Sequence, residues 1–106
     1  MAKYLVHATY TPEGVKGLLK EGGSSRFKMV QDMTAKMGGK VDCFYYCFGE
    51  TDLIAISDLP DDATAAAISM TINASGAVHM AVTPLLTPEQ IDEASKKSIE
   101  FRSPGK

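Results

Sequence analysis

Five side chains of this 106-residue sequence have the chemistry needed to bind a small molecule: His7, Arg26, Tyr46, Asp52 and His79. An imidazole can bind a metal ion, transfer a proton or contact a cofactor such as haem, and a guanidinium can hold a carboxylate or a phosphate. Asp52 lies between two apolar runs, so it is a candidate ligand contact at the end of a hairpin. We expect His7, Tyr46, Asp52 and His79 to line a cleft, with Arg26 as the partner of an anion.

Each candidate also has a structural interpretation that the sequence leaves open. The histidines can satisfy local hydrogen bonds at a subunit interface, and Asp52 can accept hydrogen bonds from the amides of a turn. Arg26 follows two glycines and two serines, where Ser24 can simply cap the following helix. Two histidines lack the third ligand of a metal site, and no serine has the surroundings of a catalytic nucleophile. We therefore expect no metal site, assign no catalytic residue and leave the cofactor unknown.

The composition is that of an ordinary soluble globular chain, with 44% hydrophobic and 23% charged residues. A net charge of -2 gives no indication of a nucleic-acid or anionic-membrane partner. No apolar run approaches the roughly 20 residues of a membrane helix, and the N-terminus opens into a strand without a signal-like segment. Cys43 and Cys47 lie too far apart along one strand to form a disulfide, so we expect a reducing, cytoplasmic setting.

Residue periodicity predicts four strands, over residues 3–10, 41–48, 53–59 and 77–85. Start and stop signals predict helices over residues 12–21, 24–37, 61–74 and 88–98. Thr-Pro-Glu begins the first and the last of these helices, and glycine pairs end the first two. An apolar stripe of Phe27, Val30, Met33 and Met37 marks the face of the second helix that should pack on the sheet.

The resulting order is β-α-β-β-α-β followed by a C-terminal helix, which predicts the α+β class and a ferredoxin-like sandwich. Its sheet should have four antiparallel strands in the order 4-1-3-2, with the two main helices on one face. At 106 residues the chain should form a single domain, with a core over residues 3–98 and a tail over residues 99–106. The tight turn at residues 49–52 argues against a doubly wound α/β sheet, because strands and helices do not alternate there.

The face of the sheet away from the helices is expected to be apolar as well. On the first strand, Val6 and Ala8 suit the core while Leu5 and His7 point the other way, and the second strand is apolar on both sides. Residues 63–88 contain no Lys, Arg, Asp or Glu, although a helix exposed to water normally carries charges. We therefore expect a homo-oligomer in which two sheets pack face to face.

Four segments carry a resemblance to a known family: KYLVHATYTPEGVKGLLKEGG, FYYCFGETDLIAISDLPD, NASGAV and TPLLTPEQIDEA. With these segments, residues 3–102 resemble the GYD domain family, small bacterial proteins with a ferredoxin-like fold. The family takes its name from a Gly-Tyr-Asp signature at the turn between the second and third strands. Gly49 and Asp52 match that signature, whereas Thr51 occupies the position of the tyrosine, so a function of the tyrosine ring does not carry over.

The resemblance implies the fold but no established activity. The ligand-binding domains of leucine-responsive regulators and the dimeric α/β barrel proteins are similar at the level of the fold, which does not establish function. Our first hypothesis is an oligomeric module, sensory or otherwise, that binds a small anionic metabolite between its subunits. One alternative is a dimeric α/β barrel enzyme, such as a cofactor-independent or haem-linked oxygenase that uses a histidine. The other is a structural protein without a ligand site, so whether the protein is an enzyme stays open.

Overall fold

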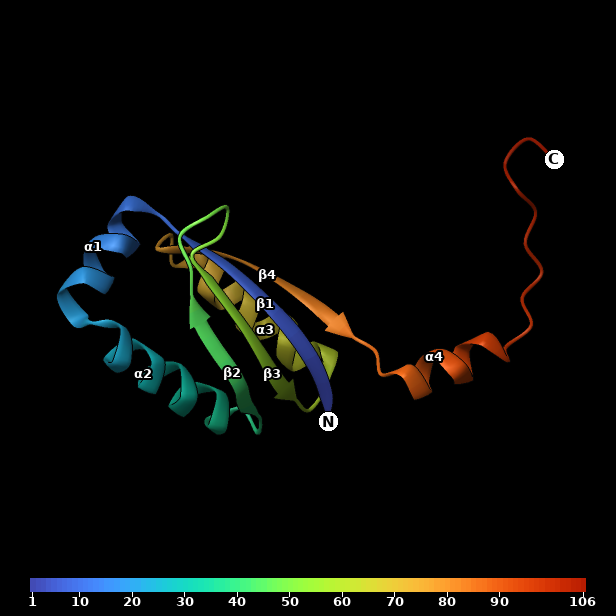
Figure 1. The fold of residues 1–106 in the computed structure, drawn as a ribbon, viewed down its shortest axis with the longest axis horizontal. Helices are drawn as coiled ribbons and strands as arrows, with labels where there is room; N and C mark the ends of the chain where they lie inside the picture. The colour runs from blue at the N-terminus through green and yellow to red at the C-terminus, as the bar shows by residue number, and fades with distance from the viewer.

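The computed structural model describes residues 1–106 and contains four strands and four helices (Figure 1). The strands are β1 (Ala2–Tyr10), β2 (Lys40–Tyr46), β3 (Leu53–Leu59) and β4 (Val78–Leu85). The helices are α1 (Pro12–Glu21), α2 (Gly23–Lys36), α3 (Asp62–Ala74) and α4 (Pro88–Ser95). None of these helices combines the length and the apolar character required to cross a membrane. The predicted number and order of elements are confirmed.

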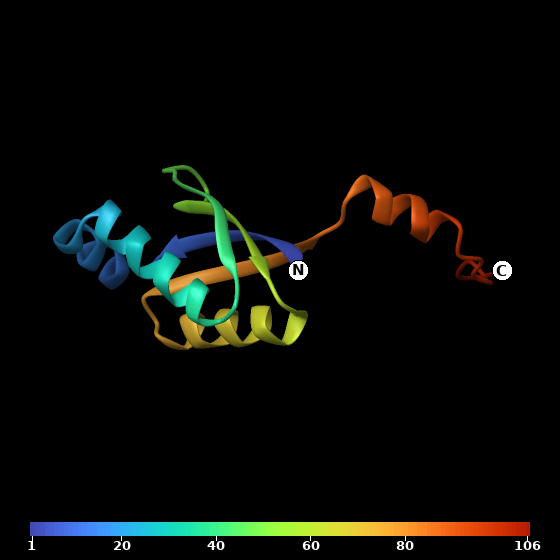
Figure 2. The same cartoon turned by 90° about the horizontal axis from the view of Figure 1, so that it is seen from below.

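The four strands form one antiparallel sheet in the order β2-β3-β1-β4. Read from the other edge, this is the predicted order 4-1-3-2, and the α+β architecture agrees with a ferredoxin-like fold. Helices α2 and α3 lie on the same face of the sheet, and no helix covers the other face (Figure 2). We call the uncovered side the open face; it carries Leu5, His7, Ile54, Ile56 and Ala81.

Local signals explain where three of the helices begin. The Thr11 hydroxyl accepts a hydrogen bond from the Gly14 amide at the start of α1. Gly22, with a φ of 91°, redirects the chain between α1 and α2 through a conformation that other residues rarely adopt. Thr87 and Gln90 form a capping box at the start of α4. The helix starts predicted from Thr-Pro-Glu, and the break predicted from the first glycine pair, are therefore confirmed.

Two predicted boundaries differ from the structure by two or more residues. Strand β2 ends at Tyr46 and not at residue 48, because the chain turns into the loop toward β3 and leaves Phe48 fully exposed. Helix α4 ends at Ser95 and not near residue 98, because the Lys96 and Lys97 amides bond back only three residues. Such bonds are typical of the tightened last turn of a helix. Neither difference changes the topology.

Two groups of buried side chains pack the sheet against the helices: Ala8, Leu53, Ala55 and Val78 in one, and Tyr4, Leu59 and Ala65 in the other. This parity confirms the predicted core side of the first and fourth strands. The Tyr4 hydroxyl donates a hydrogen bond to Asp62 at the start of α3, and this contact raises the pKa of Tyr4 to about 12. Tyr4 is therefore a neutral donor that ties β1 to α3.

The chain after β4 extends away from the sandwich. In Figure 1, α4 and the C-terminal segment project to one side, and the molecule spans 56 by 33 by 22 Å. This segment, residues 86–106, is called the arm, and it exposes Leu86, Ile91, Ile99 and Phe101 to solvent. The arm thus adds apolar surface to the molecule.

Candidate functional site

The sheet divides four of the five predicted site residues between its two faces. Arg26 and Tyr46 lie on the helix-covered side, where Arg26 lines a cavity and Tyr46 bonds to α2. His7 and His79 lie on the open face, and Asp52 lies in the loop that enters β3. The structure therefore brings Arg26 near Tyr46, and His7 near His79, but does not join the two pairs.

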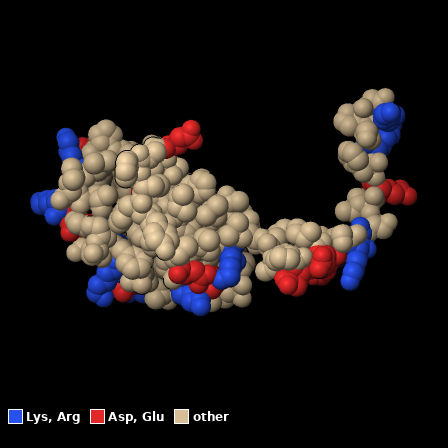
Figure 3. Space-filling model, in the orientation of Figure 1, with Lys and Arg blue, Asp and Glu red and all other residues tan.

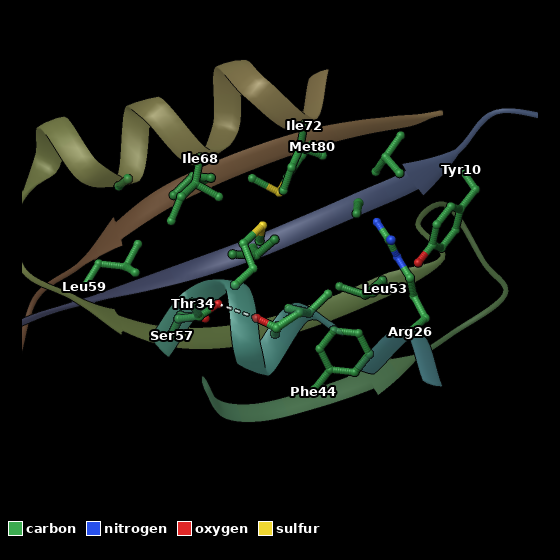
Figure 4. Close-up of a pocket in the computed structure, with 18 residues that line it drawn as sticks. Tyr10, Arg26, Thr34, Phe44, Leu53, Ser57, Leu59, Ile68, Ile72 and Met80 are labelled. Atoms are coloured by element: carbon green, nitrogen blue, oxygen red, sulfur yellow. Dashed lines mark hydrogen bonds between the residues drawn. The ribbon is translucent and has the colours of Figure 1, made fainter. Parts of the chain in front are cut away.

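A cavity of about 70 Å³ lies between the sheet and helices α2 and α3 (Figure 4). It exists because α2 packs mainly on β2 whereas α3 packs mainly on β4, which leaves the centre of the sheet between the two helices. Of its 18 lining residues, 15 are hydrophobic, among them Val6 and Ala8 on the sheet, Met33 on α2, and Ile68 and Ile72 on α3. An apolar pocket with a few polar groups is the usual form of a small-molecule site.

Arg26 and Tyr10 form the polar end of the cavity. Figure 4 shows their side chains pointing toward one another from α2 and from the end of β1. No carboxylate forms an ion pair with Arg26, so its guanidinium retains unused donors. Burial raises the pKa of the Tyr10 phenol, and the nearby Arg26 cation opposes part of that shift. Tyr10 is therefore a neutral hydroxyl at neutral pH and, like Arg26, can donate to an acceptor.

Tyr46 positions the start of α2. Its hydroxyl donates a hydrogen bond to the Gly23 carbonyl, at 3.0 Å. A Cβ atom on Gly23 would lie 3.0 Å from the Tyr46 ring, so the ring packs directly over this glycine. The same ring meets Phe44 edge-on, with 5.2 Å between the ring centroids. Tyr46 thus holds the first turn of α2, and with it Arg26, against β2.

Two hydroxyl side chains lie farther along the cavity. The buried Thr34 donates to the Val30 carbonyl one turn earlier in α2, at 2.8 Å. Ser57 is only 8% exposed, and its hydroxyl forms no hydrogen bond. Since no fully buried side-chain polar atom lacks a partner, this hydroxyl must border open space, and the space that Ser57 lines is the cavity. Ser57 therefore offers a free donor and acceptor there.

Asp52 has a structural role at the end of the sheet. Its carboxylate accepts a hydrogen bond of 2.8 Å from the Tyr10 amide, and its own amide donates to the Ala8 carbonyl at 2.9 Å. The sequence suggested turn amides as partners, but the partner belongs to β1, because β1 runs alongside the start of β3. Asp52 does not line the cavity. It fixes the backbone of Tyr10, and Tyr10 does line the cavity.

His7 and His79 are neighbours on the open face. His7 lies opposite Ala81, and His79 precedes Ala81 by two residues on β4, which makes the two histidines diagonal neighbours. Such positions are about 7–8 Å apart across an antiparallel pair. Tyr45 and Ile54 continue the same row on the other side of His7. No group of three or more His, Cys, Asp or Glu side chains has the geometry of a metal site.

A network of charged residues at the rim of the open face was not predicted. Lys3 forms ion pairs with Asp42 and with Asp58, the latter at 2.9 Å, and Lys40 lies 3.8 Å from Asp58. The hydrogen bond from Lys3 holds the pKa of Asp58 below its ordinary value of 3.8. Figure 3 shows charged atoms around the rim of this face and none across its centre. The rim is charged and the centre carries no Lys, Arg, Asp or Glu, and depletion of charged residues at the core is typical of a protein interface.

Tyr10 and Ser57 are cavity residues that the sequence analysis missed. Tyr10 shares the parity of Val6 and Ala8, so the alternation along β1 is a signal that places it on the core side. Ser57 likewise shares the parity of Ala55 on β3. The cavity itself has no sequence signal, because its volume depends on how far apart α2 and α3 stand on the sheet.

Comparison with known families matches residues 4–95 to the GYD domain. The match contains all four strands except the first residues of β1, together with the whole cavity and the Gly49-to-Asp52 turn. It confirms the resemblance carried by the four sequence segments. No curated protein and no solved structure matches the chain. The features that indicate a function are therefore the cavity, the open face and the residues that form them.

Proposed function

The chain belongs to the GYD domain family, and we propose that this member is a homo-oligomeric module that binds a small molecule. The ligand occupies the cavity between the sheet and helices α2 and α3. The open faces of two subunits pack against one another, so each subunit keeps its own cavity on its helix-covered side. Binding without a bond-making step suits a sensor or a carrier.

The observation that carries the proposal is an apolar cavity with unused hydrogen-bond donors at one end. Protein interiors are normally close-packed, and empty apolar volume costs about 24 cal/mol per Å³. On that scale a cavity of about 70 Å³ costs roughly 1.7 kcal/mol of stability. A ligand that fills the space and pairs with Arg26 recovers part of that cost, which supports a binding role.

The homo-oligomer is supported by the apolar character of the open face. Tyr45 is 70% exposed and Ile54 is 39% exposed, and both lie in the central row of that face with His7. A contiguous exposed apolar patch with a polar rim is typical of a protein interface. A two-fold axis through the patch lets the same surface meet itself, so no second protein is required.

A second candidate function is an enzyme of the dimeric α/β barrel kind, with its site between the subunits. It is favoured by the diagonal pair of His7 and His79, which packed open faces would enclose together with the same pair of the second subunit. Imidazoles in an apolar interface suit proton transfer or haem ligation. A Soret band in the purified protein would support the haem form, and a colourless protein would contradict it.

The proposed function is tested by thermal unfolding of the full-length protein in the presence of a panel of small metabolites. A ligand of the folded state at 100 times its dissociation constant should raise the free energy of unfolding by about 2.7 kcal/mol. We expect stabilisation by compounds that combine an apolar part with one polar group. The absence of any stabilising compound from a panel that spans acids, alcohols, amines, metals and haem would contradict the proposal.

A further inference from the structure

We infer that the cavity binds an unbranched aliphatic monocarboxylate, with the carboxylate on Arg26 and Tyr10 and the hydrocarbon chain along the sheet. The inference rests on the proposed function, because it names the ligand class of the same cavity. It depends on three features of the site: the charge at one end, the narrow apolar interior, and a hydroxyl that faces the cavity and forms no hydrogen bond.

The charged end selects the head group. Arg26 lies in the first turn of α2, half-buried, without an ion pair, and facing the Tyr10 hydroxyl across the end of the cavity (Figure 4). A guanidinium presents two parallel N–H groups that match the two oxygens of a carboxylate. No other charged residue lines the cavity, so one negative charge on the ligand is matched and a second would be buried unpaired.

The interior selects the body of the ligand. The lining residues on β3 run from Leu53 to Leu59, a length of about 20 Å at the rise of a strand, yet the volume is only about 70 Å³. A cavity of about 150 Å³ holds a benzene ring, so this space suits a single hydrocarbon chain of about three to four carbons. Met33 and Met80 line it, and their flexible side chains can move aside for a slightly longer chain.

The Ser57 hydroxyl is a second sign that the cavity is built for an occupant. Ser57 as a residue is 8% exposed, and its hydroxyl, which forms no hydrogen bond, is accessible from the cavity that it lines. A purely structural cavity between sheet and helices has no use for such a hydroxyl, since an apolar residue of similar size would avoid the cost of taking it from water. A ligand or a ligand-bound water in the cavity can satisfy it.

Two kinds of ligand have this carboxylate chemistry, a simple fatty acid and an aliphatic amino acid, and an adjoining pocket bears on which of them binds. This pocket, about 150 Å³ under α1, shares Tyr10 and Arg26 with the cavity and is also lined by Glu13 and Glu21. Neither glutamate forms an ion pair with Arg26. An α-ammonium group beside the carboxylate would face these two acids, so an aliphatic amino acid shares the binding chemistry of a simple fatty acid.

The test is a titration of the full-length protein with pentanoate, norvaline and pentan-1-ol, followed by calorimetry. Pentanoate and norvaline share one chain and differ in the ammonium group, whereas pentan-1-ol keeps the chain and lacks the charge. We expect saturable binding of pentanoate or norvaline at one site per chain, and binding of pentan-1-ol at least about tenfold weaker. Shortening pentanoate to propionate should weaken binding about three- to fourfold for each methylene removed.

Matched variants locate the head group. Arg26→Gln should weaken pentanoate binding at least about tenfold, and Tyr10→Phe should weaken it less, because a neutral donor is lost and not a charged one. Lys28→Gln is the control: it removes the same charge from the same helix, at a side chain that is 77% exposed and outside the cavity. It should leave the affinity unchanged. If Arg26→Gln fails to fold, Arg26→Lys keeps the charge, loses the planar fork and should still weaken binding.

Two results would overturn the inference in different ways. Equal binding of pentan-1-ol and pentanoate, insensitive to Arg26→Gln, would reject the carboxylate class and leave the cavity as a binding site for neutral molecules. Binding of neither compound, together with no stabilising metabolite in the thermal screen, would reject the proposed function as well.

Discussion

Two charged residues near the end of β1 have opposite roles. The Asp52 carboxylate is satisfied by the Tyr10 amide, whereas the Arg26 guanidinium, which faces the Tyr10 side chain, has no ion-pair partner. The signature aspartate therefore stabilises the hairpin and the end of β1. Thr51 lies beside it and accepts a hydrogen bond from the Cys47 thiol through its carbonyl, at 3.1 Å. The signature turn thus builds the frame that carries Tyr10, and the ligand chemistry lies on the neighbouring helix.

Asp52→Ala should lower the free energy of unfolding by about 1.5–3 kcal/mol, because it removes a hydrogen bond to a charged acceptor and leaves the Tyr10 amide unpaired. Asp52→Asn keeps an acceptor and should cost less. Urea unfolding gives both values, with an unchanged denaturant dependence as the sign that only stability has changed. Glu50→Ala, an exposed substitution in the same loop, should have almost no effect. Equal losses for Asp52→Ala and Glu50→Ala would contradict this role.

The ion pairs of Asp58 predict a loss of stability in acid. The hydrogen bond from Lys3 lowers the pKa of Asp58 from 3.8, so the folded protein holds this proton less tightly than the unfolded chain. The ionised Asp58 contributes fully to the free energy of unfolding above about pH 4–5, and this contribution is lost as the pH falls through the lower, folded-state pKa. At the other extreme, Asp42 and Asp58 raise the pKa of Lys3 from 10.5 to about 12, so that contribution is lost as the pH rises through about 12.

Unfolding of wild type and Asp58→Asn between about pH 6 and about pH 2 measures the acid effect. The difference in unfolding free energy between the two proteins should shrink toward acid. Asp32→Asn serves as a control, because Asp32 is in an exposed pair with Lys28, 3.7 Å apart. That pair should contribute little at any pH. An Asp58→Asn difference that stays constant down to pH 2 would show that Lys3 does not stabilise the carboxylate.

At the scale of elements, local signals predicted every helix and strand. Caps such as Thr11 and breaks such as Gly22 act within a few residues, so they can be read without a structure. Local signals do not determine on which face of the sheet each β2 side chain lies or which residue it pairs with. A register shift between Val41 and Cys43 places Tyr46 on the helix-covered side, opposite the face of His7. The Lys3 network depends on the long-range pairing of β1, β2 and β3, and the cavity depends on the spacing of α2 and α3 on the sheet, so neither could be predicted.

The packing of α1 on the start of β4 depends on a glycine. A Cβ atom on Gly14 would lie 2.1 Å from the Ala77 carbonyl oxygen, which also accepts the Thr11 amide at 3.0 Å. Gly14→Ala must push α1 away and should cost about 1–3 kcal/mol. Gly17 is in the same helix with nothing within 4 Å of its Cβ position, so Gly17→Ala should stabilise by about 0.5–1 kcal/mol. Thermal unfolding of the Gly14→Ala and Gly17→Ala variants measures both effects. Two changes in stability of the same sign would contradict the close packing at Gly14.

The molecule exposes large apolar side chains in two separate regions. The open face exposes Tyr45 and Ile54, and the arm exposes Leu86, Ile91, Ile99 and Phe101. The arm's helix α4 has 8 residues, and isolated helices shorter than about 12–15 residues are marginally stable in water. The proposed oligomer accounts for both features, because a second subunit can cover the open face and provide contacts for the arm.

Ile54→Asp should convert the proposed oligomer to monomers without unfolding the chain, because Ile54 lies in the central row of the open face and is 39% exposed. Val15→Asp, on α1 at an equal exposure of 39%, makes the same chemical change outside that face and should leave the mass unchanged. Sedimentation equilibrium gives both masses. A wild-type mass equal to a single chain would contradict the proposed assembly.

The most direct test of the central claim is the methyl spectrum of methionine-labelled protein during titration with the tightest ligand of the thermal screen. Met80 lines the cavity and Met33 borders it, whereas Met70 and Met1 are 71% and 73% exposed elsewhere. Met29 lies in a separate groove on the outside of α2, which Met33 also borders. The account predicts saturable shifts of the Met80 and Met33 methyl signals with those of Met70 and Met1 unchanged. Shifts confined to Met29, or spread over the exposed methionines while Met80 stays fixed, would contradict binding in the cavity.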